Sequence, residues 1–151
     1  MSELQVDKIA ARTAGLRSVN NPCFVCGPNN PIGLGVTFRL EEDAETLVCR
    51  AEFTPGEHHV GFSNVTHGGI VFALLDDVMA NWLWLQGEDS FTAKADIRYR
   101  AELPVGTPVA LQSWCTKRKG RLAVMEGQLS SQADGFVYAE ASASFMLAQK
   151  S

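Results

Sequence analysis

Residues 68–87 read GGIVFALLDDVMANWLWLQG, and this stretch decides the fold class. Its apolar residues follow one another without the alternation of a strand, and Gly87 ends the run, so we expect one long helix. At 1.5 Å per residue such a helix is about 30 Å long. Because it is apolar on almost every side, it should be buried. Asp76 and Asp77 near its middle argue against a lipid-facing span.

Alternating apolar and polar residues predict strands on both sides of this helix. Turns rich in Gly, Pro and Asp separate the strand patterns. One helix laid across one largely antiparallel sheet of about five to six strands is an α+β arrangement. The expected strands cover residues 36–40 and 47–53 before the helix and residues 91–103, 108–116, 121–130 and 136–148 after it.

Length and charge describe a single soluble domain. The chain has 151 residues, with 13 Lys and Arg against 17 Asp and Glu. We expect a helical extension over residues 1–18, an ordered turn-rich loop over 19–35 and the core over 36–148. The lack of a basic block argues against a nucleic-acid partner, because phosphates require clustered cations. No export signal is evident, so the four cysteines are expected to be reduced thiols in the cytoplasm.

The start and the middle of the helix carry the chemistry. Gly68-Gly69 at a helix N-terminus exposes backbone N–H groups that can hold a carbonyl oxygen or a developing oxyanion. The alternative is that both are loop glycines. Burying an unpaired carboxylate within the helix costs about several kcal/mol of folding free energy. Asp76 and Asp77 therefore need polar partners if they are buried. Asp77 and Asn81 are spaced to pair on the helix surface, and the alternative is that Asp77 contacts the substrate.

His67-Gly68-Gly69, followed six residues later by Asp76, resembles the signature of hotdog-fold acyl-CoA thioesterases of the phenylacetyl-CoA type, within the 4-hydroxybenzoyl-CoA thioesterase-like superfamily. Further segments are similar in the same order along the chain. They are CFVCGPNNPIGL at 23–34, TAKADIRYR at 92–100 and DGFVYAEASASFML at 134–147. The resemblance implies a hotdog fold and thioester hydrolysis.

The resemblance also implies roles for single residues. Gly69, with Gly68, would donate N–H groups to the thioester carbonyl. Asp76 would act as general base on water or as nucleophile, and Thr92 would orient that carboxylate or its water. His67 would organise the loop beside the carbonyl, with a direct role left open.

Other consequences of the resemblance concern the assembly and one departure from the family pattern. In the family the carboxylate and the glycines usually come from different subunits, so a homodimer with shared active sites is expected, and a dimer of dimers beyond it. Some relatives carry a catalytic Asn six residues before the His, where this chain has Gly61. Asn64 is then the candidate for the second carbonyl donor.

Two rival functions stay open at this point. A hydratase or dehydratase of the same fold usually carries Pro-Gly at the helix start, and the Gly68-Gly69 pair with Asp76 argues against it. A non-catalytic module that binds acyl-CoA is the rival of another class, and the presence of both Asp76 and Thr92 favours catalysis. Hydrolysis of an activated thioester needs no metal and no organic cofactor.

Two charged or reactive clusters have uncertain roles. The basic turn at residues 117–121 is either a solvated hairpin or a clamp for the phosphates of coenzyme A, a role for which Arg98 competes. Its candidate phosphate ligands are Arg118, Lys119 and Arg121. Cys23 and Cys26 form a Cys-x-x-Cys pair, for which we weighed zinc and thiol redox chemistry against a packed loop. We favour the packed loop and expect no metal.

Overall fold

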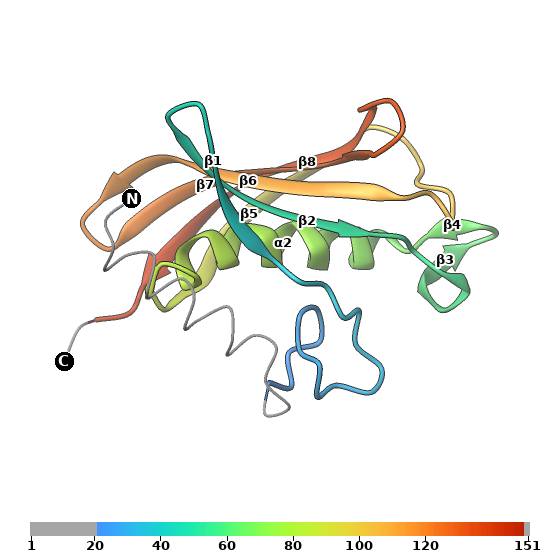
Figure 1. Cartoon of the computed structure of the whole chain (residues 1–151), viewed down its shortest axis with the longest axis horizontal. Coiled ribbons are helices and arrows are strands. Elements are labelled where there is room, and N and C mark those ends of the chain that lie inside the picture. The colour runs from blue at the N-terminus through green and yellow to red at the C-terminus, as the bar shows by residue number, and fades with distance from the viewer. Residues whose placement is uncertain (1–20, 150–151) are drawn as a thin grey trace.

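The computed structural model describes residues 21–149, and its main element is one six-stranded sheet (Figure 1). The strand order is β1-β2-β6-β7-β8-β5, and every neighbouring pair is antiparallel. The strands are β1 (Arg39–Asp43), β2 (Thr46–Phe53), β5 (Ser90–Tyr99), β6 (Val109–Lys119), β7 (Leu122–Ser131) and β8 (Val137–Leu147). A separate hairpin of β3 (Val60–Phe62) and β4 (Val65–Thr66) follows the 3-10 helix η1 (Glu57–His59).

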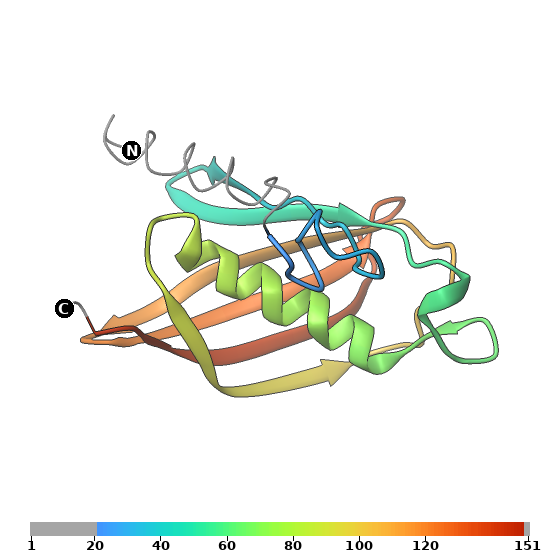
Figure 2. The ribbon, with the colours of Figure 1, turned by 90° about the horizontal axis from the view of Figure 1, so that it is seen from below.

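Helix α2 (Gly68–Trp84) lies across one face of the sheet (Figures 1 and 2). His67 caps its N-terminus, and the chain turns away after Leu85 towards Gly87, which has φ +87°. That left-handed backbone favours glycine. The expected helix and its end are therefore confirmed, and the α+β class with them.

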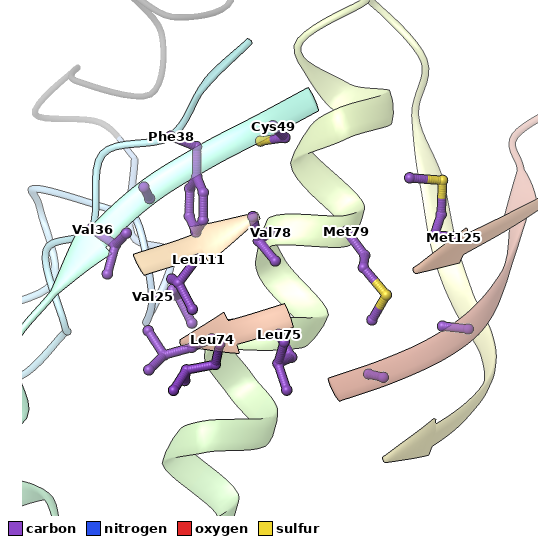
Figure 3. Packing of buried hydrophobic residues seen from close by; sticks show 14 of the residues in the cluster. Val25, Val36, Phe38, Cys49, Leu74, Leu75, Val78, Met79, Leu111 and Met125 are labelled. Carbon is purple, nitrogen blue, oxygen red and sulfur yellow. The ribbon is translucent and has the colours of Figure 1, made fainter. Parts of the chain in front are cut away.

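The core is the layer between α2 and the sheet. Figure 3 shows Leu74, Val78 and Met79 of the helix among side chains from the strands, and these three are fully buried. The closest approach is at β7, where a Cβ on Gly127 would lie 3.2 Å from Cγ of Met79. The buried Ser113 hydroxyl of β6 donates to the Val78 carbonyl at 2.6 Å, which fixes the other side of the helix.

Three sequence expectations need correction. The first strand begins at Arg39 and not at Val36, although Val36 and Phe38 are buried as core residues. Residues 55–66, for which the sequence predicted neither a helix nor a strand, contain η1 and the β3–β4 hairpin. The helix is not enclosed on every side, and its partly buried apolar residues are Ile70, Ala73, Ala80, Trp82 and Trp84.

The segment 21–35 lies on the same side of the sheet as α2, near the β1–β2 edge (Figures 1 and 2). Val25 and Cys26 of this segment belong to the core cluster, so the loop is anchored and ordered as expected. The helical extension expected over residues 1–18 lies outside the described residues. None of the helices in residues 21–149 is long and apolar enough to cross a membrane.

Strand β5 forms an open edge of the sheet. It pairs with β8 on one side and has no strand on the other within the described chain. Phe91 and Tyr99 at its two ends are 60% and 50% exposed. A long edge strand with exposed aromatic side chains is a surface suited to pairing with another chain.

Candidate functional site

The N-terminus of α2 is exposed and is built from His67, Gly68 and Gly69. His67 has the extended backbone of a cap residue, and its Nδ1 accepts the Gly69 N–H at 2.8 Å. Among the described residues no partner is found for the Gly68 N–H. Tyr99 from β5 donates its hydroxyl to the Gly68 carbonyl at 2.8 Å. The Gly68 N–H is thus open to a ligand. The Gly69 N–H is covered by the His67 side chain, which can rotate away.

Gly61 determines where His67 lies. A Cβ on Gly61 would be 2.8 Å from Cα of His67 and 3.1 Å from its ring, so this backbone contact leaves no room for a side chain. The His67 N–H also donates to the His59 carbonyl at 2.8 Å. Position 61 must therefore be glycine in this chain, because His67 packs directly against it.

Asp76 and Thr92 meet between α2 and β5. The Thr92 hydroxyl donates to Oδ1 of Asp76 at 2.7 Å, although the two residues are 16 positions apart. Asp76 is half-buried, and within residues 21–149 its second oxygen makes no further hydrogen bond. A bulge between Thr92 and Lys94 interrupts the β5–β8 register at this point. Bulges often redirect side chains next to sites, so the local irregularity fits a positioned hydroxyl.

Asp77 points to a different part of the structure. Burial raises its pKa to about 6, with hydrogen bonds from Cys26 and Asn81 working against that effect. The expected pair with Asn81 is confirmed, because Asn81 Nδ2 lies 3.2 Å from the Asp77 carboxylate. The neighbours of Asp77 are Cys23 and Cys26 of the 21–35 segment. The structure therefore does not bring Asp77 to the Asp76–Thr92 pair.

A pocket of about 400 Å³ opens beside the helix N-terminus. Its lining includes Gly68, Val71, Tyr99, Leu103 and Tyr138. These side chains are mostly apolar and aromatic, which suits an acyl group. The sequence patterns did not point to Tyr99 or Tyr138, because each has the alternation of an ordinary strand residue.

The two halves of the candidate site are separated within one chain. Asp76 follows Gly69 by seven positions on the same helix, which corresponds to about 10 Å along its axis. A water molecule that attacks a bound carbonyl must lie about 3 Å from both the carbonyl carbon and its base. The carboxylate and the N–H groups of one chain therefore lie about two helical turns apart along α2.

The remaining predicted binding residues lie elsewhere. Asn64 is exposed in the β3–β4 turn with φ 57°, and its carbonyl accepts the Val105 N–H at 2.9 Å. Arg98 lines a groove on the outer face of the sheet with Asp96, Trp114 and Glu140. It is therefore separated from the helix side by the sheet itself.

The basic turn joins β6 and β7, and it is exposed. Arg118 lies 3.6 Å from Glu88, and Arg121 donates through Nε to the Leu147 carbonyl at 2.9 Å. Both contacts tie the turn to the end of the molecule where α2 stops. Lys119, also exposed, has no ion pair within the described residues.

Comparison with known proteins places this geometry in a family. The family model described as Thioesterase superfamily matches residues 63–138, half of the chain. Acyl-coenzyme A thioesterase THEM5 of Mus musculus is 30% identical over 97 residues, 64% of this chain and 39% of that protein. Acyl-coenzyme A thioesterase THEM4 of Xenopus laevis is 31% identical over 101 residues, 66% and 44% respectively. The chain thus spans about two fifths of the length of the curated relatives it matches.

Solved structures agree on the fold. The thioesterase superfamily protein RHA08564 superposes with a TM-score of 0.73 at 27% identity, covering 82% of this chain and 62% of that one. The PaaI protein from the phenylacetic acid degradation operon of E. coli superposes with a TM-score of 0.78 at 14% identity, covering 97% and 98%. The single helix on a six-stranded antiparallel sheet is the hotdog fold, and the chain belongs to the thioesterase superfamily.

Proposed function

We propose that this protein hydrolyses acyl-CoA thioesters to a free acid and coenzyme A. The observation that carries the proposal is the 2.7 Å hydrogen bond from Thr92 to Asp76, which orients a carboxylate with one oxygen left for water. The helix N-terminus with its unpaired Gly68 N–H supplies the complementary half of a hydrolytic site. The names of the THEM4 and THEM5 relatives support acyl-CoA as substrate. A related thioesterase from Streptococcus pneumoniae has been solved with coenzyme A.

The reaction needs few groups. Water attacks the carbonyl carbon while Asp76 accepts its proton, and the N–H groups of Gly68 and Gly69 hold the developing oxyanion. The carbon–sulfur bond then breaks, and the coenzyme A thiolate takes the proton back from Asp76. Alternatively Asp76 attacks the carbonyl carbon directly, and the carbon–sulfur bond breaks to leave an anhydride and the coenzyme A thiolate, which takes a proton from solvent. Water then hydrolyses the anhydride to the free acid and the Asp76 carboxylate. A single turnover in oxygen-18 water separates the two routes, because only the anhydride route places the label in Asp76.

His67 acts in this proposal as a placeholder for the substrate. Its Nδ1 now accepts the Gly69 N–H, and a thioester carbonyl would take over that hydrogen bond. The exchange keeps the amide satisfied when the site is empty. His67 therefore positions the carbonyl site and is not required to carry a proton.

The active site is proposed to form between two copies of the chain. The separation of about 10 Å between Gly69 and Asp76 along the helix axis supports an arrangement in which the two halves come from different chains. The open edge strand β5 carries Thr92 and ends in the exposed Phe91 and Tyr99, so pairing of β5 with a second β5 would bring the two halves together. Further association into a dimer of dimers stays a prediction, which light scattering on the purified protein would test.

The basic turn is proposed to hold the phosphates of coenzyme A. Lys117, Arg118, Lys119 and Arg121 place four cations on an exposed hairpin of a chain with net charge −4. Arg and Lys both suit phosphate recognition. Arg98 on the outer face of the sheet is no longer favoured for this role. The cytoplasmic location also stays a prediction.

The test is release of free thiol from a panel of acyl-CoAs of different chain length and aromatic content. We expect Asp76→Asn to lose about 10²- to 10⁴-fold in kcat, the usual contribution of an acid–base group. Asp96→Asn is the matched control, because Asp96 is an exposed carboxylate on the same strand as Thr92 but lines the outer groove. Binding of acyl-CoA without turnover would instead favour a ligand-sensing module. Undiminished turnover in Asp76→Asn would refute the mechanism.

A further inference from the structure

Three potential metal ligands from two separate segments converge outside the hydrolytic site. Cys23 and Cys26 belong to the 21–35 segment, and Asp77 belongs to α2. One ligand atom from each lies within 4.8 Å of the other two. In place of the metal-free packed loop expected from the sequence, we propose that this cluster binds a zinc ion, which fastens the 21–35 segment to the central helix.

The two cysteines are arranged as in a zinc-binding turn. Their Cys-x-x-Cys spacing is the usual one for a pair of ligands on one ion. The Cys26 N–H points at Sγ of Cys23 at 3.5 Å, and the Gly27 N–H donates to the Cys23 carbonyl at 2.8 Å. A backbone N–H directed at sulfur stabilises a thiolate, as outer-sphere hydrogen bonds to metal ligands do.

Gly27 shows how tightly this turn is closed. A Cβ at Gly27 would lie 2.3 Å from the Cys23 nitrogen and 2.6 Å from its carbonyl oxygen. Both contacts are with backbone, so no other residue fits without opening the turn. The sequence therefore specifies a turn that holds the two sulfur atoms on one side.

Asp77 supplies a negative charge without a counter-cation. Its hydrogen-bond partners are the neutral Asn81 amide and the Cys26 thiol, and in the described residues no Lys, Arg or His pairs with it. Taking a carboxylate out of water without compensation is costly, and a bound cation is one of the standard remedies. Asn81 Nδ2 donates to the Asp77 main-chain carbonyl at 2.9 Å and to Oδ2 of its carboxylate at 3.2 Å, and the second bond would hold the carboxylate in place as a ligand.

The donor set selects the kind of ion. Two thiolates and one carboxylate suit zinc, whereas magnesium and calcium prefer oxygen ligands alone. Binding would release the two thiol protons to solvent and leave the fourth position of a tetrahedral ion for water. His58 and His59 do not complete the set: His58 is 90% exposed beside Glu57, and Nδ1 of His59 accepts the Gly56 N–H.

The proposed ion is separate from the hydrolytic residues. Asp76 and Asp77 are adjacent on α2, yet Asp76 faces Thr92 on β5 and Asp77 faces the two cysteines. Successive helical residues point about 100° apart, which accounts for the divergence. The ion would thus stabilise the segment that covers α2 without taking part in the reaction.

Metal analysis of the full chain purified without chelator tests the proposal. We expect one zinc per chain by mass spectrometry of the metal. Replacement of zinc by cobalt should give a thiolate-to-metal absorption band in the near ultraviolet. Zinc content no higher than that of the Cys23→Ser/Cys26→Ser variant, or a cobalt spectrum without the thiolate band, would overturn the assignment.

Single variants identify the ligands. Cys23→Ser and Asp77→Asn should each lose most of the metal, with circular dichroism showing whether the fold persists. Cys115→Ser is the matched control, because Cys115 is a partly buried thiol on β6 that contacts the Lys117 carbonyl instead. Equal loss in Cys115→Ser would contradict the proposal. Asp76→Asn should keep full zinc stoichiometry while losing hydrolysis, so the two proposals fail independently.

Discussion

Mixing two inactive variants tests whether the active site is shared between chains. Asp76→Asn removes the carboxylate, and Gly69→Pro removes the N–H donor in the first helical turn, where proline is tolerated. Asp96→Asn is the control, because Asp96 lines the outer groove of the sheet and belongs to neither half of the site. We expect losses of about 10²- to 10⁴-fold for Asp76→Asn and about 10²- to 10³-fold for Gly69→Pro.

The magnitude of the recovery follows from the helix spacing. If Gly69 and Asp76 of one chain are about 10 Å apart and serve different sites, each mixed dimer contains one intact site and one doubly damaged site. Random exchange of equal amounts makes about half of the dimers mixed, so about one quarter of all sites regain full activity. Thiol release from the best acyl-CoA, followed after subunit exchange, measures this recovery. A mixture no more active than the mean of its parents would refute a site shared between chains.

Three further substitutions test single contacts. Thr92→Val should lower kcat roughly tenfold, the effect of about 1.5 kcal/mol from a lost hydrogen bond to a carboxylate, whereas Thr92→Ser should retain most activity. Gly61→Ala should lower kcat/KM by about ten- to a hundredfold with correct secondary structure by circular dichroism, because its Cβ would displace His67 from the carbonyl site. Lys119→Glu should raise KM several-fold with little change in kcat and weaken the salt dependence of KM; an unchanged KM would remove the basic turn from coenzyme A binding.

Much of the fold could be predicted from local patterns. The apolar run from Gly68 and its end at Gly87 placed α2 correctly, because a buried helix needs a long apolar stretch and a left-handed residue to leave it. The strands of the main sheet followed from alternation and turn residues. The β3–β4 hairpin was missed because each of its strands is too short to show an alternation, with three residues in β3 and two in β4.

Only some contacts of the candidate site could be predicted from the sequence. The pairing of Asp76 with Thr92 followed from the family resemblance and is present in the structure. The cap formed by His67 on Gly69 is a local contact, but it depends on a backbone conformation that the residue type does not dictate. The approach of Cys23 and Cys26 to Asp77 joins segments about 50 positions apart in a way that no local periodicity encodes.

The close contact of β7 with α2 supports the helix that carries the reacting groups, whereas most of the acyl pocket is lined by other elements. Met79 packs directly over Gly127, where an added Cβ would lie 3.2 Å from Cγ of Met79, so any larger residue there would crowd the helix that carries Asp76 and the N-terminal amides. The pocket beside them is lined by Gly68 and Val71 of α2 and otherwise by β4, β5, β8 and the segment before β6, none of which takes part in the contact between Met79 and Gly127. Substitutions there can reshape the acyl pocket while the reacting groups stay where they are. A change of acyl-group preference therefore requires substitutions only in the pocket lining, and the catalytic groups keep their roles.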